Sequence, residues 1–329
     1  MDDRFLHEHR RSPDPAFARS LRSRLANIED ETPARASHLR PWLAAAAALV
    51  VGGLAFTVPA VRVAAQSALD LFRVRSFAAV QVDEARMREI GDLQDANPAG
   101  ALMPFERDGE GRDPGEPVEY PTVQAAAAAA DLPGVRTPSA LPAELRLERT
   151  MVTGEGESRL VVRAERLERL LDALALSDVH VPSGLDGQRI EVRVPHSVVQ
   201  HYGNGKRKLV VIEARSPEVS LPPGLDLREM GEIGLRVLGL DAAEARRTAA
   251  TIDWRSTLLV PMPTNAASFR RVEVGGGRGL LVSLAPSKDE SGNRHRGGTV
   301  VMWSQWDRVH VVRGDVSEQE VLEVALSLR

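Results

Sequence analysis

The clearest hydrophobic pattern in the chain is a stretch at residues 41–61 that contains no charged side chain. A helix of about 20 residues rises roughly 30 Å, which matches the hydrocarbon thickness of a bilayer. Arg40 and Arg62 flank the stretch, and Trp42 lies where an interfacial aromatic side chain is common. The pattern therefore predicts one transmembrane helix at 41–61.

This stretch has two other interpretations. Its many alanines also suit a buried helix of a globular domain, and Val63-Ala64-Ala65 resembles a signal-peptide cleavage region. A polar tail of about 40 residues is too long for the usual start of a signal peptide. We therefore expect an uncleaved, single-pass anchor in contact with the lipid bilayer.

The orientation of the anchor is only weakly set by the flanking charges. Arginines on the side that stays in the cytoplasm usually outnumber those on the other side. The expected topology has a cytoplasmic N-terminus and an extracytoplasmic C-terminal part at the cell membrane. The competing residues are Arg22, Arg24, Arg35 and Arg40 before the span, and Arg62, Arg73 and Arg75 after it.

Residues 1–40 form the predicted cytoplasmic tail, with one amphipathic helix at about 14–28. Asp14 and Pro15 provide an N-cap and a first-turn proline. So short a tail cannot bury the apolar stripe of this helix by itself, so the stripe needs a partner groove, the bilayer surface, or partial disorder. We expect a partner protein to contact Phe17, Leu21, Leu25 and Ile28.

The sequence predicts that the segment after the span folds only in part. Residues 62–90 predict a membrane-proximal helix followed by a strand near 74–82. Residues 91–121 contain five prolines with Gly and Asp/Glu runs, a composition typical of a linker.

Residues 122–329 have the pattern of one globular α+β domain built on a mostly antiparallel sheet, with inserted helices and a C-terminal helix. Ser317 and Glu320 form the sequence signature of a capping box at that last helix. The other helices are expected at 122–130, 165–175, 225–238 and 241–250. Strands are expected at 159–163, 189–194, 206–215, 257–261, 269–274, 278–285, 298–304 and 308–313.

Composition excludes several kinds of chemistry. The chain has 329 residues, a net charge of −4 and no cysteine. The lack of cysteine excludes disulfides, thiolate nucleophiles and zinc sites made from cysteine. The absence of a strong basic field argues against nucleic acid as a partner. We expect no cofactor and no metal.

No motif predicts a catalytic site, so we expect a protein that is not an enzyme. Gly275-Gly276-Gly277 lies between two strands and favours a hairpin turn over a phosphate loop. Glu155 and Glu157 are expected at a solvated hairpin tip, and His310 on a sheet face. Trp303 and Trp306 flank a tight turn, and we expect them to pack on the core.

A family resemblance rests on three sets of residues. The chain resembles bacterial single-pass anti-sigma-factor-like membrane proteins in the run ahead of its single span, Asp14-Pro15-Ala16-Phe17-Ala18-Arg19-Ser20-Leu21-Arg22-Ser23-Arg24-Leu25. Thr122-Val123-Gln124-Ala125-Ala126 followed by Pro138-Ser139-Ala140-Leu141-Pro142 resembles the start of an uncharacterised extracytoplasmic domain found behind such anchors. Three later segments resemble the terminal strand, turn, strand and helix of that domain: Val300-Val301-Met302-Trp303, Val309-His310-Val311-Val312-Arg313-Gly314 and Leu322-Glu323-Val324-Ala325-Leu326-Ser327-Leu328.

The resemblance implies a regulatory membrane protein whose outer domain senses or scaffolds and whose tail helix can hold a sigma factor. Many anti-sigma factors carry a His/Cys zinc motif, and the absence of cysteine excludes that module here. The alternative is an extracytoplasmic binding or scaffolding module for envelope polymers or lipids, with the N-terminal part serving only as an anchor.

Overall fold

The computed structural model describes residues 71–96, 102–109, 111–142, 144–222, 224–263, 267–285, 287–288, 294–295 and 297–328. The predicted tail helix with Phe17, Leu21, Leu25 and Ile28 lies outside these residues, as does the predicted span at 41–61. Within the described ranges no helix is long and apolar enough to cross a membrane.

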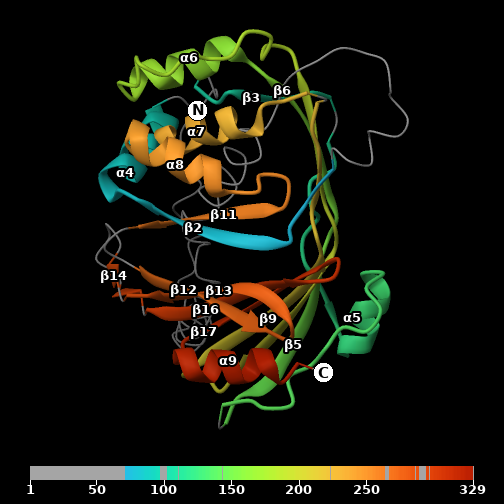
Figure 1. Cartoon of the computed structure of the whole chain (residues 1–329). Helices are drawn as coiled ribbons and strands as arrows, with labels where there is room; N and C mark the ends of the chain where they lie inside the picture. The colour runs from blue at the N-terminus through green and yellow to red at the C-terminus, as the bar shows by residue number, and fades with distance from the viewer. Residues whose placement is uncertain are drawn as a thin grey trace, which may run out of the picture. The chain divides into compact units, whose positions relative to one another are not determined.

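The described part of the chain has an α+β fold of mostly antiparallel sheets, as predicted (Figure 1). A five-stranded sheet has the order β1-β10-β7-β6-β3, and an eight-stranded sheet has the order β12-β13-β16-β17-β9-β8-β5-β4. The five-stranded sheet contains β1 (Leu71–Arg73), β3 (Phe105–Arg107), β6 (Gly156–Val162), β7 (Arg189–Val194) and β10 (Glu218–Ser220). The eight-stranded sheet contains β4 (Val118–Tyr120), β5 (Arg146–Thr153), β8 (Ser197–Gly203), β9 (Lys208–Arg215), β12 (Ala267–Val274), β13 (Gly277–Leu284), β16 (Gly298–Gln305) and β17 (Arg308–Gly314).

Two smaller pairs and six helices complete the described elements. β2 (Ser76–Val82) pairs in parallel with β11 (Thr257–Pro263), and β14 (Ser287–Lys288) pairs with β15 (Arg294–His295). The helices are α4 (Glu84–Ala96), α5 (Val123–Ala129), α6 (Ala164–Ala173), α7 (Leu227–Val237), α8 (Ala242–Thr251) and α9 (Glu318–Leu326).

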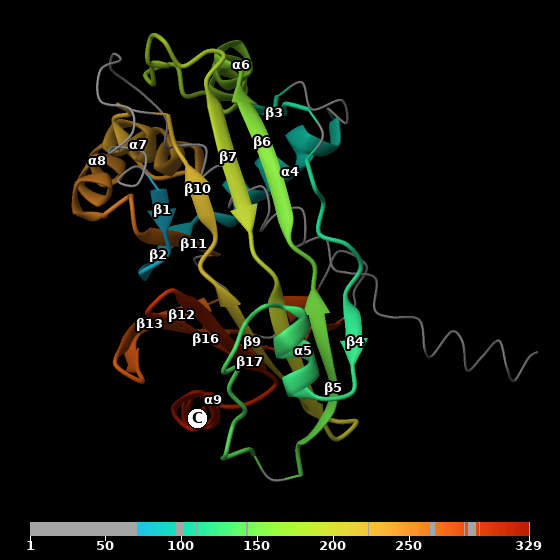
Figure 2. The same cartoon turned by 90° about the vertical axis from the view of Figure 1, so that its right-hand side faces the viewer.

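Three long strands run through both large sheets, and each is broken for two residues where it passes from one sheet to the other (Figure 2). The breaks lie at 154–155, 195–196 and 216–217. Two of them contain proline, Pro195 and Pro217, which has no N–H to donate to a sheet ladder. The register is kept across the breaks: Ser197 pairs with Thr153 on one side, and Val194, three residues before Ser197, pairs with Gly156, three residues after Thr153, on the other. The pairs of Ser197 with Ala214 and of Arg193 with Glu218 keep the register in the same way. The two sheets are therefore joined by backbone pairing that is nearly continuous.

The largest hydrophobic core lies among β2, β7, β13 and helices α4, α6, α7 and α8. The predicted apolar positions of α6, Leu167, Leu170, Leu171 and Leu174, are all buried in it. Two smaller clusters lie on one face of the eight-stranded sheet. One is formed with α9 and contains Val312 and Val321, and the other is formed with α5 and contains Ala126 and Val198.

Most local signals in residues 122–329 predicted the correct element. Thr122 caps α5, and Ser317 with Glu320 forms the predicted capping box of α9. Gly275 and Gly276 form the predicted hairpin turn, with φ angles of 56° and 80° that favour glycine.

The prediction of a linker at 91–121 is wrong for the residues that the structure describes. The end of α4 lies in this segment, β3 pairs with β6, and β4 pairs with β5. Composition alone favoured a linker because these strands are short and obtain their partners from distant parts of the chain. The predicted helix after the span also differs at its end, since Leu71–Arg73 is strand β1.

The interpretation of Glu155 and Glu157 as a hairpin tip is also wrong. Glu155 lies in the break between β5 and β6, and Glu157 pairs with Arg193 in the ladder. The Glu155 carboxylate accepts a short hydrogen bond from Arg193 and lies 3.9 Å from Arg112. The hydrogen bond from Arg193 is the main cause that lowers the pKa of Glu155. Gly154 and Glu155 therefore lie where a strand continues from one sheet into the other.

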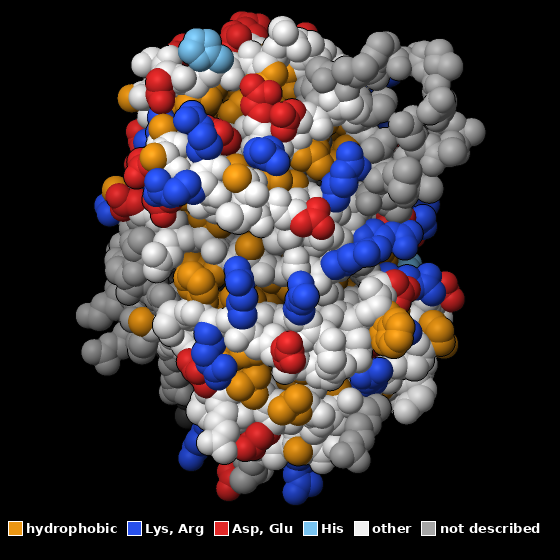
Figure 3. Space-filling view, in the orientation of Figure 1, with side chains coloured by type: hydrophobic (Ala, Val, Ile, Leu, Met, Phe, Trp, Pro, Cys, Tyr) orange, Lys and Arg blue, Asp and Glu red, His pale blue; other side chains and the backbone are white. Residues whose placement is uncertain are grey.

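Positive and negative side chains are mixed over the face seen in Figure 3, with apolar patches between them. Among the described residues, three of the more exposed large apolar side chains are Trp306 at 89%, Leu326 at 61% and Val118 at 54%.

Candidate functional site

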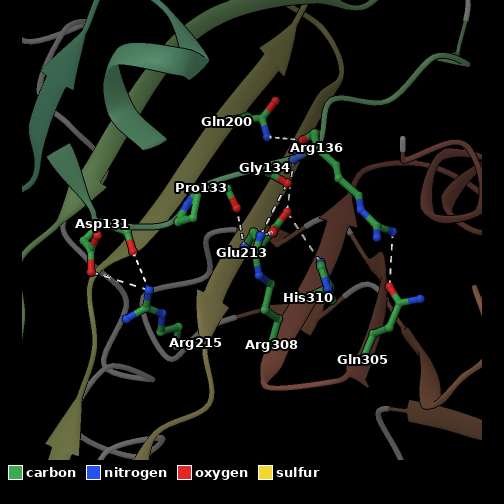
Figure 4. A network of polar contacts seen from close by, with 10 residues as sticks. All are labelled: Asp131, Pro133, Gly134, Arg136, Gln200, Glu213, Arg215, Gln305, Arg308 and His310. Carbon is green, nitrogen blue, oxygen red and sulfur yellow. Dashed lines mark hydrogen bonds and ion pairs between the residues drawn. The ribbon is translucent and has the colours of Figure 1, made fainter. Parts of the chain in front are cut away.

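The most distinctive group of polar residues is buried on the face of the eight-stranded sheet that carries α5 and α9 (Figure 4). The segment 131–140 follows α5 and crosses this face. Its far end pairs with the end of the chain, since Pro138 forms a bridge with Leu328 and the Ser139 N–H donates to the Ser327 carbonyl at 3.2 Å. Side chains from the sheet hold the middle of the segment.

Glu213 on β9 is the centre of this group and is only 1% exposed. Its carboxylate accepts a hydrogen bond from the Arg136 N–H at 3.2 Å and a short one from the Arg308 guanidinium. Arg308 also donates to the carbonyls of Pro133 and Gly134. The ion pair between β9 and β17 thus binds the backbone of the crossing segment through both partners: the glutamate accepts an N–H, and the arginine donates to two carbonyls.

Gln200 on β8 is fully buried and binds the same segment. Its Nε2 donates to the Arg136 carbonyl at 2.8 Å, and its Oε1 accepts from the Tyr202 hydroxyl at 2.7 Å. Burial raises the pKa of Tyr202 to about 12, which keeps the hydroxyl protonated as a donor. Because Glu213 accepts the Arg136 N–H and Gln200 donates to its carbonyl, side chains satisfy the backbone of Arg136 as a neighbouring strand would.

His310 on β17 completes the group. It is 2% exposed and stacks on Trp303, with ring centroids 4.9 Å apart. Its Nδ1 lies 3.7 Å from Glu213, too far for a hydrogen bond, and has no other partner. Burial is the main cause that lowers the pKa of His310, and Arg136 and Arg308 act in the same direction against Glu213. The ring is therefore neutral near pH 7.

This arrangement suits the fixing of a backbone segment better than turnover of a substrate. Glu213, His310 and Gln200 have almost no exposed surface, and their polar atoms face the segment or one another. Among the described residues, no group of three or more His, Asp or Glu side chains is placed to hold a metal ion.

The turn between β16 and β17 lies at the edge of this group and has an exposed tryptophan. Gln305, just before it, accepts a hydrogen bond from the Arg136 side chain at 3.1 Å and donates to the Gly275 carbonyl at 2.6 Å. Trp306 is 89% exposed and has a φ of 60°, an uncommon value for a bulky residue. A two-residue turn of this kind favours Gly, Asn or Asp.

The two tryptophans expected to pack on the core behave differently. Trp303 is buried as predicted, but the prediction for Trp306 is wrong because the turn directs its side chain outward. His310 lies on a sheet face as predicted. The roles of Glu213, Gln200 and Arg308 were missed, although alternation along β9 places Glu213 on the same face as Leu209 and Val211.

Comparison with family models, with curated proteins and with solved structures finds no match to this chain.

The ion pair predicts a large effect of one substitution. Arg308→Ala leaves the Glu213 carboxylate buried without its cation, and breaking a buried pair in this way costs roughly 3–5 kcal/mol of unfolding free energy. Arg313→Ala is the matched control, because Arg313 lies on the same strand, is exposed, and has no ion pair with a described residue. The control should change stability by less than about 0.5 kcal/mol. Equal losses in urea unfolding would contradict the role of the pair.

His310 predicts a dependence of stability on pH. Its pKa is lowered in the folded chain, so the unfolded chain takes up the proton first as pH falls below about 6.5, and stability decreases. His310→Phe keeps a ring beside Trp303 and should lose less unfolding free energy between about pH 7 and pH 5 than the native chain. Part of the decrease should remain, because burial also lowers the pKa of His201. Identical pH profiles for the two chains would rule out His310 as a source.

Proposed function

We propose that this chain is a single-pass membrane regulatory protein with an extracytoplasmic sensor or scaffold domain and a cytoplasmic helix that binds a partner. The resemblance to anti-sigma-factor-like proteins makes a sigma factor the partner class to test. Phe17, Leu21, Leu25 and Ile28 are the residues proposed to contact it. The domain would act by changing the state of the anchor and thereby the availability of the tail.

One observation supports this proposal more than any other. The described residues begin at β1, about ten residues after the predicted span, and the first two strands each pair with another strand and place side chains in the largest core. β1 pairs with β10 in the five-stranded sheet, and β2 places Phe77, Val80 and Val82 in the largest core. An anchor attached in this way is connected to the core through a short connector, so a force or a displacement can pass between them.

Further contacts fix the start of the domain. The Val74 N–H donates to the Ser216 hydroxyl at 2.7 Å, and the Arg75 N–H donates to the Ser256 carbonyl at 2.8 Å. Ser216 lies in the break between β9 and β10, where the strands pass from one sheet to the other. The entry point of the anchor is thus bonded to the junction of the two sheets.

The alternative function is a binding or scaffolding module for envelope polymers or lipids, with the N-terminal part as a mere anchor. It is favoured by the other face of the eight-stranded sheet, where Met151, Val199 and Ile212 form a half-buried apolar row. Arg149 and Arg313 lie in the next row of this face and have no ion pair with a described residue. Such a surface suits a ligand with apolar and anionic groups.

The proposal predicts the topology of the full chain. A reporter that is active only outside the bacterial cytoplasm should be active when fused after Arg329 and inactive when fused before Met1. The reverse result would contradict the extracytoplasmic domain.

In the same cells, deletion of residues 1–30 with Arg35 and Arg40 kept separates the two functions. A regulator should lose its effect on gene expression, and a mere anchor should keep the function of the domain.

A further inference from the structure

The exposed Trp306 and the segment between β1 and β2 are joined by a short path of hydrogen bonds. Ser216 accepts from the Val74 N–H at 2.7 Å, and its own N–H donates to the Asp307 carbonyl at 2.7 Å. On the other side of the turn, the Ser304 hydroxyl donates to the Arg75 carbonyl at 2.5 Å. The residues that flank Trp306 are therefore bonded to the segment that leads back to the predicted span.

The connector between the predicted span and the fold is short. Residues 62–70 can extend at most about 30 Å, and the four steps from Leu71 to Arg75 add at most about 14 Å. A tether of this length holds the domain close to the membrane surface and gives any contact between them a high effective concentration. The turn that contains Trp306 is thus kept within reach of the bilayer.

The side chains around this turn are suited to the headgroup region of a bilayer. Tryptophan is enriched at membrane interfaces, where one part of its ring meets apolar chains and its N–H meets water. The two other tryptophans in the described residues, Trp254 and Trp303, are buried at 5% and 2% exposure. Full exposure of the ring in a turn of unfavourable φ is difficult to explain by folding alone.

Two arginines accompany the tryptophan. Arg75 and Arg278 are exposed, and neither guanidinium has a hydrogen bond or ion pair with a described residue. Arg278 follows Gly277, where an added Cβ would lie 2.2 Å from the Ser304 carbonyl, so the two turns are in contact. Glu273 and Asp307 are also exposed here, so the surface is mixed in charge.

We infer that the β16–β17 turn rests on the membrane, with Trp306 inserted into the headgroup region of the bilayer that holds the span. Arg75 and Arg278 would contact lipid phosphates beside it. This inference rests on the proposed function, because it needs the anchor at 41–61. The docked turn would fix the orientation of the domain, and release of the turn would change how the domain is connected to the span.

The test uses the full chain, which has no cysteine and so accepts a single spin label. Asp307→Cys places the label beside Trp306 and keeps the tryptophan. Lys208→Cys is the matched control, since Lys208 is exposed and lies about 26 Å along β9 from the break at Ser216. Each labelled chain is reconstituted into vesicles of phosphatidylcholine and phosphatidylglycerol, and collision with oxygen and with a water-soluble nickel complex is measured.

The label at 307 should collide several-fold less with nickel than the label at 208, and Trp306→Ala in the 307 background should restore the nickel collisions. Equal accessibility of 307 and 208 in a chain that resists alkaline extraction would overturn this inference and leave the proposed function intact. A chain that alkaline carbonate removes from the vesicles would overturn both.

Discussion

The fold depends on three strands that do not stop at the border between its two large sheets. Each runs through one sheet, loses its ladder for two residues, and continues in the other sheet with the register kept. The prolines at 195 and 217 interrupt the ladder because they have no N–H to donate. Since the same strands form both sheets, neither sheet can rearrange without the other.

The buried polar group around Glu213 also fixes parts of the chain in position. Burying Glu213 and Arg308 has a desolvation cost, and an apolar pair of similar volume would often be as stable. Here the pair fixes the position of the segment 131–140, because its hydrogen bonds go to the backbone of that segment. Gln200 and Tyr202 complete the bonding of that backbone. The segment in turn pairs with the end of the chain next to α9, so the helices α5 and α9 are fixed on one face.

Local signals predicted the helices and many of the strands of residues 122–329. Caps, apolar periodicity and turn glycines act over a few residues, and the capping box at Ser317 and the turn at Gly275 formed as expected. Features that depend on distant partners were missed. β3 and β4 are stable only because β6 and β5 pair with them, and Gly154-Glu155 has the composition of a hairpin turn although the chain continues straight.

The candidate site was predictable only in part for the same reason. Alternation placed His310 on a sheet face, but its stacking on Trp303 depends on the pairing of β16 with β17. The pairing of Glu213 with Arg308 joins residues 95 positions apart. The outward direction of Trp306 follows from a turn in which its backbone φ is 60°. Tryptophan does not favour this angle, so a tryptophan in the sequence does not predict such a turn.

In the described residues, the first strands are part of the largest core, and the β16–β17 turn is hydrogen-bonded to the segment that joins them. The pairing and burial of β1 and β2 predict that they belong to the same cooperative unit as the two large sheets, which the proposed coupling of the domain to an anchor requires. Native-state hydrogen exchange of the full chain tests this most directly. The account predicts that amides of Phe77 to Val82 exchange with the same free energy as those of β7 and β9. Exchange of the β2 amides through a local opening of much lower free energy would contradict it.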